Sequence, residues 1–192
     1  QLTRLLRALD APGNSYVIHV DARADESVHA AAANFAANHP SSAVIASEKI
    51  VWGSWRLARA QIRGVKRALE LCDRWQYCMN LTAQDYPLRT QQQIAAQLEA
   101  GPAGANYLDV LDFDKATSVP RRRLEWYWLP LRGKMRRTLR RRPLPFHVYW
   151  GSNYFAFTRA ACEFVTTSEL SRRMQREFRF ALCSDELIFQ NM

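Results

Sequence analysis

The stretch "VIHVDARAD", residues 17–25, joins an apolar strand to a charged pair. The segment "SYVIHV" is typical of a strand buried inside a sheet. Asp21 follows that strand directly, and Arg23 comes two residues later. Ligands of open α/β sheets bind beyond the carboxyl ends of the strands. We therefore expect Asp21 to accept hydrogen bonds from a ribose or base edge and Arg23 to pair with a phosphate or stack on a ring. The alternative is a turn aspartate beside a solvated arginine.

Strands and helices alternate along the rest of the chain. Apolar runs predict strands at 15–20, 42–47, 76–82, 105–113, 146–150 and 153–158. Helical spacing of apolar residues, with capping residues at Ser54, Thr90, Thr158 and Ser184, predicts helices at 1–10, 25–38, 54–72, 90–100, 159–165 and 185–192. This alternation predicts an α/β fold with a mainly parallel sheet and helices on both faces.

The 192 residues fit a single domain. Residues 115–145 are rich in arginine with interleaved tryptophan and tyrosine, and we expect an irregular basic insertion there with at most one helix. The chain begins on Gln1 and stops within the apolar pattern "LIFQNM", so we expect the domain to be truncated at both ends. No apolar run reaches the roughly 18 residues of a spanning helix, and no secretory signal is visible. The expected location is the cytoplasm or the cytoplasmic face of a membrane.

The net charge of +9 and the pI of about 9.8 favour polyanionic partners: nucleic acid, anionic lipid or a phosphorylated small molecule. The runs "RRRLEWYW" and "RGKMRRTLRRRP" could bind RNA through phosphates and stacking. Residues 121–142 could equally dock on anionic lipid, at roughly 1 kcal/mol per basic residue, or form a solvated surface. A basic α/β module that binds RNA or anionic lipid without catalysis is therefore one hypothesis.

Several residues could carry chemistry, each with a plain structural alternative. Trp52, before Gly53 and a helix, either lines a nucleotide pocket or belongs to the core. Asp85 lies in a turn after the strand at 76–82, where an Asx-turn is the alternative. Asp185 and Glu186 open the last predicted helix, where acidic residues often just complement the dipole. Otherwise Glu186 points into the crevice as an ionised base.

The sequence gives little support for a metal site or for a dinucleotide-binding site. Asp112 and Asp114 have the DxD spacing that holds a divalent cation in many sugar-nucleotide enzymes, but this spacing is common by chance, and we expect no metal. The cysteines lack a CxxC spacing, which argues against zinc and for ordinary buried thiols. Neither GxGxxG nor GxxxxGKS is present.

Five stretches in order resemble the core-2/I-branching β-1,6-N-acetylglucosaminyltransferases and the related peptide O-xylosyltransferases. They are "YVIHVDARAD", "IVWGSWRLARAQ", "YCMNLTAQDYPLRT", "WGSNYFAFTRAACEFV" and "CSDELIF". The resemblance implies a GT-A-type, Rossmann-like fold. It also implies inverting transfer of GlcNAc or xylose from a UDP-sugar to a hydroxyl of a glycan, a lipid-linked glycan or a protein. No metal or other cofactor is implied, and nucleic acid becomes an unexpected partner.

The resemblance also implies roles for particular residues. Asp21 and Arg23 match the uridine-binding pair, and Trp52 matches a donor-pocket residue. Asn153 falls where the family places a residue near the sugar and the acceptor, and Asp85 stands near the position of the DxD in other GT-A enzymes. Glu186 matches the general base, although Ser184 replaces the family's proline. The cations that stabilise the leaving UDP would lie beyond the end of this chain, with Arg159 or the basic insertion as substitutes.

Overall fold

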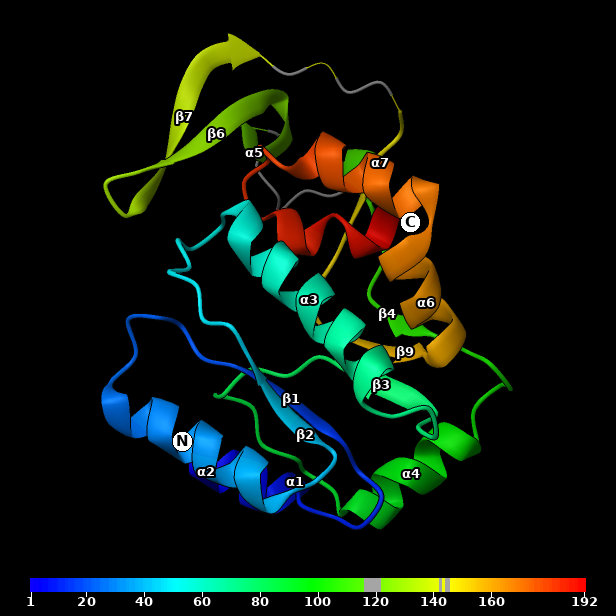
Figure 1. Cartoon of the computed structure of the whole chain (residues 1–192). Coiled ribbons are helices and arrows are strands. Elements are labelled where there is room, and N and C mark those ends of the chain that lie inside the picture. Colours follow the sequence, from blue (N-terminus) through cyan, green and yellow to red (C-terminus); the bar gives the residue numbers. More distant parts are fainter. Residues whose placement is uncertain (116–121, 142, 144–145) are drawn as a thin grey trace.

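The computed structural model describes residues 1–115, 122–141, 143 and 146–192, and the elements are arranged as in Figure 1. The helices are α1 (Leu2–Leu9), α2 (Glu26–Asn38), α3 (Trp55–Leu71), α4 (Gln91–Glu99), α5 (Arg122–Glu125), α6 (Arg159–Thr167) and α7 (Glu169–Phe178), with 3₁₀ turns η1 (Phe113–Lys115), η2 (Ser184–Glu186) and η3 (Phe189–Asn191). The strands are β1 (Tyr16–His19), β2 (Ser42–Ile45), β3 (Tyr77–Met79), β4 (Tyr107–Leu108), β5 (Leu111–Asp112), β6 (Trp126–Leu131), β7 (Lys134–Arg141), β8 (Tyr149–Trp150) and β9 (Phe155–Thr158).

The first two strands form a small parallel sheet between helices. β1 and β2 pair in parallel, with Tyr16 opposite Ser42, and Figure 1 shows them between α2 and α3. Ile18 and Val20 pack into a core with Leu6 of α1 and Ala32 of α2. The alternation of side chains along β1 leaves His19 for the opposite face. This βαβ arrangement delivers Asp21 to the carboxyl end of a parallel strand, as the sequence predicts.

The other described strand pairs are antiparallel, which corrects the prediction of a mainly parallel sheet. β9 lies between β3 and β4 and runs opposite to both, and β5 pairs antiparallel with β8. The chain leaves through β4 and β5 and returns through β8 and β9, so the return lies beside the outgoing segment as in a long hairpin. Residues 113–148, between β5 and β8, are long enough for a parallel crossover as well as for this antiparallel return, so the length of the connection does not fix the strand direction. The mixed α/β class is nevertheless as predicted.

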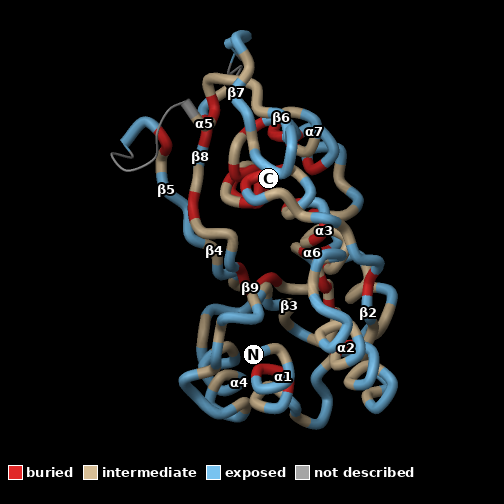
Figure 2. Tube along the Cα trace, turned by 90° about the vertical axis from the view of Figure 1, so that its left-hand side faces the viewer, coloured by how far each residue is buried: buried red, intermediate tan, exposed pale blue. Residues whose placement is uncertain are grey.

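The larger core lies under the C-terminal half of the chain. It centres on Phe178, Leu124, Ile188 and Cys162, which are almost inaccessible to solvent, and Figure 2 shows the buried residues concentrated around the C-terminus. Buried apolar side chains of this size each contribute about 1.5–3 kcal/mol to stability. None of the helices in the described part of the chain has the length and apolar character needed to cross a bilayer.

The basic insertion contains more regular structure than predicted. In its described part, α5 leads into an antiparallel hairpin of β6 and β7, which projects beyond the body in Figure 1. Arg132 and Gly133 form its two-residue turn with φ values of 50° and 76°, the left-handed backbone of the turns that match hairpin twist. Residues 116–121, 142 and 144–145 of the predicted insertion lie outside the described residues.

The C-terminal segment also differs from its prediction. Residues 185–192 do not form one helix but contain η2 and η3. Ser184 is the first residue of η2 and not an N-cap, and its hydroxyl donates to the carbonyl oxygens of Phe178 and Ala181. The preceding helix α7, capped by Ser168, was not predicted. The capping box of Thr90 is confirmed, and Ser54 stands at the N-cap of α3 without a side-chain capping bond.

Candidate functional site

The charged pair at the end of β1 clamps the loop before α3. Arg23 donates from Nε and Nη2 to the two carboxylate oxygens of Asp21, at 3.0 and 2.9 Å. The Asp21 carboxylate also accepts from the Ile50 backbone N–H at 3.0 Å, and Arg23 donates to the Ile50 carbonyl. The Arg23 bonds hold the pKa of Asp21 well below its usual range. Asp21 therefore stays ionised and fixes both the guanidinium and the loop, while Arg23 remains half exposed.

A short turn then links this clamp to the C-terminal segment. The Ser54 N–H donates to the Val51 carbonyl and closes a turn that carries Trp52, whose side chain is 70% exposed. Gly53 has a φ of 73°, and its carbonyl accepts from the Cys183 N–H at 2.8 Å. Cys183 has a φ of 58°, so two residues in left-handed conformation meet across this bond. Trp52 is thus not a core residue, and it stands at the junction of two segments.

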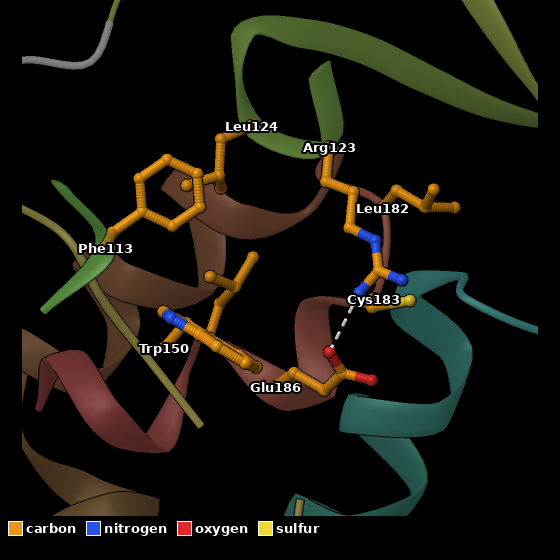
Figure 3. A pocket seen from close by; sticks show the side chains of 8 residues that line it. Phe113, Arg123, Leu124, Trp150, Leu182, Cys183 and Glu186 are labelled. Carbon is orange, nitrogen blue, oxygen red and sulfur yellow. Dashed lines mark hydrogen bonds and ion pairs between the residues drawn. The ribbon is translucent and has the colours of Figure 1, made fainter. Parts of the chain in front are cut away.

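Glu186 lies three residues beyond that junction, on the rim of a narrow pocket. Its Oε2 accepts from Arg123 Nη1 at 3.1 Å, as the dashed line in Figure 3 shows. The pocket is also lined by Phe113, Leu124, Trp150, Leu182, Cys183 and Leu187. Burial in these apolar surroundings raises the pKa of Glu186, and the Arg123 guanidinium partly offsets this effect. A cavity of about 10 Å³ has room for a single water beside the carboxylate.

Asn153 contacts the residue before Glu186, and Asp85 contacts the residue after Asn153. Asn153 Nδ2 donates to Asp185 Oδ2 at 3.3 Å, and the Asn153 carbonyl accepts from Asn80 at the end of β3. Tyr154 donates its hydroxyl proton to Asp85 Oδ1 at 3.2 Å, while Asp85 Oδ2 accepts from a backbone N–H in its own turn. Asp85 therefore does not form the predicted Asx-turn, because it bonds the N–H of Thr82, three residues before it; it also connects to the residue next to Asn153.

The predicted site residues therefore belong to one connected region. Asp21 holds Ile50 at one end of the turn 50–53, and Cys183 holds Gly53 at the other. Three consecutive Cα–Cα steps of 3.80 Å put Ile50 and Gly53 at most about 11 Å apart. Glu186 follows three residues after Cys183, and Asn153 contacts its neighbour Asp185. Segments from four distant parts of the sequence thus meet around this turn.

Sequence reasoning did not assign a role in the site to Arg123, Asp185 or Tyr154. Arg123 lies within a run of arginines, and no feature of the sequence distinguishes it from its neighbours. Arg159, named as a substitute cation, is committed elsewhere: it donates to the carbonyls of Cys72 and Leu69 and pairs with Glu163. A larger hollow of about 510 Å³ lies along α1 and Tyr86, and it contains none of the predicted site residues.

A group that could bind a cation lies beside the site. Asp112, Asp114 and His147 bring their ligand atoms within 4.8 Å of one another, the only such group among the residues that the structure describes. His147 lies 3.0 Å from Asp112 and 3.5 Å from Asp114, and Lys115 lies 3.5 Å from Asp112. The sequence indicates the aspartate pair but not the histidine. The carboxylates of this group already have side-chain partners in His147 and Lys115. The expectation that the protein binds no metal stays a prediction.

Asp185 is the buried acid of this region, and its titration is testable. Only 5% of the residue is exposed, Oδ1 has no partner among the described residues, and burial raises its pKa to about 6. The folded state therefore holds this proton more tightly than the unfolded chain. Its contribution to the free energy of unfolding is full below about pH 4 and is lost as the pH rises through about 6.

We therefore expect the wild type to lose about 2 kcal/mol of stability between about pH 4 and pH 7 relative to Asp185→Asn, which does not titrate. Urea unfolding of both proteins at the two pH values measures this difference. Asp73→Asn is the matched control, because Asp73 is largely exposed. A difference between wild type and Asp185→Asn that does not change with pH contradicts the expectation.

Comparison with known proteins identifies the group to which this arrangement belongs. The sequence pattern described as "Core-2/I-Branching enzyme" matches residues 1–192. The chain belongs to the core-2/I-branching enzyme family. The resemblance expected from the five stretches is thereby confirmed, and the family is one of glycosyltransferases.

Relatives within the core-2/I-branching enzymes are distant but cover nearly the whole chain. A bovine beta-1,3-galactosyl-O-glycosyl-glycoprotein beta-1,6-N-acetylglucosaminyltransferase is 28% identical over 193 residues, which cover 98% of this chain and 44% of that protein. Xylosyltransferase 1 of the dog is 29% identical over 197 residues, which cover 100% of this chain and 20% of that protein. The human xylosyltransferase 2 is 27% identical over 197 residues. The chain thus spans less than half the length of these relatives.

Proposed function

We propose that this chain carries the donor-binding end and the general base of an inverting glycosyltransferase. The transferase moves GlcNAc or xylose from a UDP-sugar to a hydroxyl of a glycan, a lipid-linked glycan or a protein. The observation that carries the proposal is the turn 50–53, which ties the Asp21–Arg23 pair to the segment of Glu186. In a GT-A-like fold, the turn 50–53 would bring the bound donor sugar close to the Glu186 carboxylate.

The proposed chemistry is a single displacement. The Glu186 carboxylate takes the proton of the acceptor hydroxyl, whose oxygen forms the new bond to the anomeric carbon. The bond from that carbon to the diphosphate breaks on the opposite face, and UDP leaves with the electron pair. The raised pKa of Glu186 suits a base, because a carboxylate with a higher proton affinity takes up the proton of the acceptor hydroxyl more readily.

The donor end rests on the clamp of Asp21 and Arg23. With Nε and Nη2 held, the Arg23 guanidinium presents its remaining N–H groups to solvent, where they could bind uridine or phosphate. The exposed Trp52 ring offers a face for stacking.

Metal-independent transfer is part of the proposal. Asp85 stands where a metal-binding aspartate is expected, and both of its oxygens accept hydrogen bonds from protein groups. Basic side chains would then have to stabilise the leaving diphosphate. A purely RNA-binding or lipid-binding module is not favoured, because the family of the chain is one of glycosyltransferases.

Calorimetric titration of UDP into the full-length protein tests the donor end. We expect Asp21→Ala to weaken binding at least about tenfold, since it frees both Arg23 and the loop at Ile50. Asp73→Ala, at an exposed position after α3, should bind as the wild type does. EDTA should leave the affinity unchanged. Equal affinity in Asp21→Ala refutes the donor assignment, and loss of binding in EDTA refutes metal independence.

A further inference from the structure

The hairpin of β6 and β7 carries a positive charge that is not part of the proposed donor clamp or of the proposed base. Its two strands and turn contain Arg132, Lys134, Arg136, Arg137, Arg140 and Arg141, and no acidic residue. It is joined to the body at its base, where the Trp128 N–H donates to the Phe180 carbonyl at 2.9 Å. Figure 1 shows the rest of the ribbon projecting away from the sheets and helices. This shape leaves both faces of its outer half open to a partner.

One face of the outer hairpin alternates aliphatic and cationic side chains. Leu129 lies opposite Arg136 and Leu131 lies opposite Lys134, and cross-strand partners share a face of the ribbon. Leu129 is 45% exposed and Leu131 is 58% exposed. Neither Lys134 nor Arg136 has an acidic partner among the described residues. This face therefore offers apolar side chains flanked by unpaired cations.

We propose that this face docks the protein on a bilayer containing anionic lipid. The leucines enter the boundary between head groups and acyl chains, and the flanking cations bind the phosphates of the head groups. Aliphatic insertion next to unpaired basic residues is the combination that gives binding to an anionic membrane surface. The docking is separate from sugar transfer, and it does not depend on the proposed donor or base.

RNA is a less suitable partner for the same charge. Single-stranded nucleic acid binds to open aromatic faces, on which successive bases stack. Here Arg137 lies over the Trp126 ring at 4.4 Å and Arg141 lies over it at 5.4 Å, while Arg140 lies over the Tyr127 ring at 5.7 Å. The guanidinium groups thus occupy the rings that bases would need, whereas the leucines are exposed.

Sedimentation of the full-length protein with vesicles tests the proposal. We expect binding to vesicles of phosphatidylcholine mixed with phosphatidylglycerol, and much weaker binding to phosphatidylcholine alone. Lys134→Glu/Arg136→Glu should weaken partitioning by about thirtyfold or more, from roughly 1 kcal/mol per basic residue near the surface. Leu129→Ser/Leu131→Ser should weaken it at least about tenfold.

Matched variants separate the hairpin from net charge and general hydrophobicity. Lys66→Glu/Arg176→Glu makes the same charge change at exposed positions elsewhere, and Leu88→Ser removes a leucine that is 98% exposed. Both should bind vesicles as the wild type does, and Leu129→Ser/Leu131→Ser, which leaves the cations of the hairpin in place, should keep the UDP affinity of the wild type. Equal vesicle binding by the hairpin variants and the wild type overturns the proposal. Binding of single-stranded RNA without binding to anionic vesicles also overturns it.

Discussion

Glu186→Gln is expected to lower the rate of sugar transfer at least about a hundredfold while the affinity for UDP stays within about twofold. The amide has the shape of the carboxylate, and its oxygen can still accept the hydrogen bond that Arg123 Nη1 makes at 3.1 Å. It cannot take a proton from the acceptor hydroxyl. The rate and the UDP affinity of the full-length variant, measured by product formation and by calorimetry, therefore separate loss of the base from loss of the donor site.

The pH dependence of the wild type gives the same assignment a second test. Burial raises the pKa of Glu186, so its protonated form persists to a higher pH than that of a free glutamate. Since only the ionised carboxylate acts as the base, the acid limb of the rate profile should lie above the usual glutamate range, and Glu186→Gln should lose that limb. Glu163→Gln, on the exposed side of α6, is the control and should retain activity. Near-normal turnover in Glu186→Gln would remove this residue from the mechanism.

Gly151→Ala is expected to cost about 3 kcal/mol of stability, because its methyl group has no space. A Cβ at this position would lie 1.9 Å from the Asp109 carbonyl oxygen and 2.7 Å from the carbonyl carbon. Both are backbone atoms, which cannot move aside as a flexible side chain can. Gly151 also donates its N–H to the Glu186 carbonyl at 3.0 Å, so relief of the clash would displace the segment of the proposed base.

Thermal unfolding of the full-length protein measures this cost, with an expected fall in Tm of roughly 6–12 °C. Gly64→Ala provides the matched control within α3, where an added Cβ meets no atom within 4 Å. That substitution should stabilise the protein by about 0.5–1 kcal/mol, because alanine loses less backbone entropy in a helix than glycine. If Gly151→Ala unfolds at the wild-type temperature, the close approach of Gly151 to Asp109 is wrong.

Local sequence patterns were sufficient for elements whose signals lie within a few residues. The strand β1, the capping box at Thr90 and the N-cap at Thr158 were all predicted and are present, although only Ile18 of the four residues of β1 is fully buried. The positions of Asp21 and Trp52 beside β1 and α3 follow from the same patterns. Each depends on side-chain periodicity or on bonds between residues close in the chain, which the sequence displays directly.

The pairing of strands that lie far apart in the chain could not be predicted from the sequence. The antiparallel return of β8 and β9 depends on which segments meet after the insertion, and no local pattern encodes that choice. The 3₁₀ turns at the C-terminus stand where a helix was predicted, and the Ser184 hydroxyl bonds to the carbonyls of Phe178 and Ala181, six and three residues before it. Arg123 could not be told from its arginine neighbours until its contact with Glu186 was seen.

By itself, the sequence determined the α/β class, the family resemblance and the identity of the acidic groups that the proposed chemistry needs. The tertiary structure alone decided that the turn 50–53 joins Asp21 to Cys183, that Arg123 reaches Glu186, and that the basic insertion forms a hairpin. The reason is physical: periodicity and capping are local properties of a chain. Hydrogen bonds between residues 63 or more positions apart, such as Arg123 to Glu186, depend on how whole segments pack.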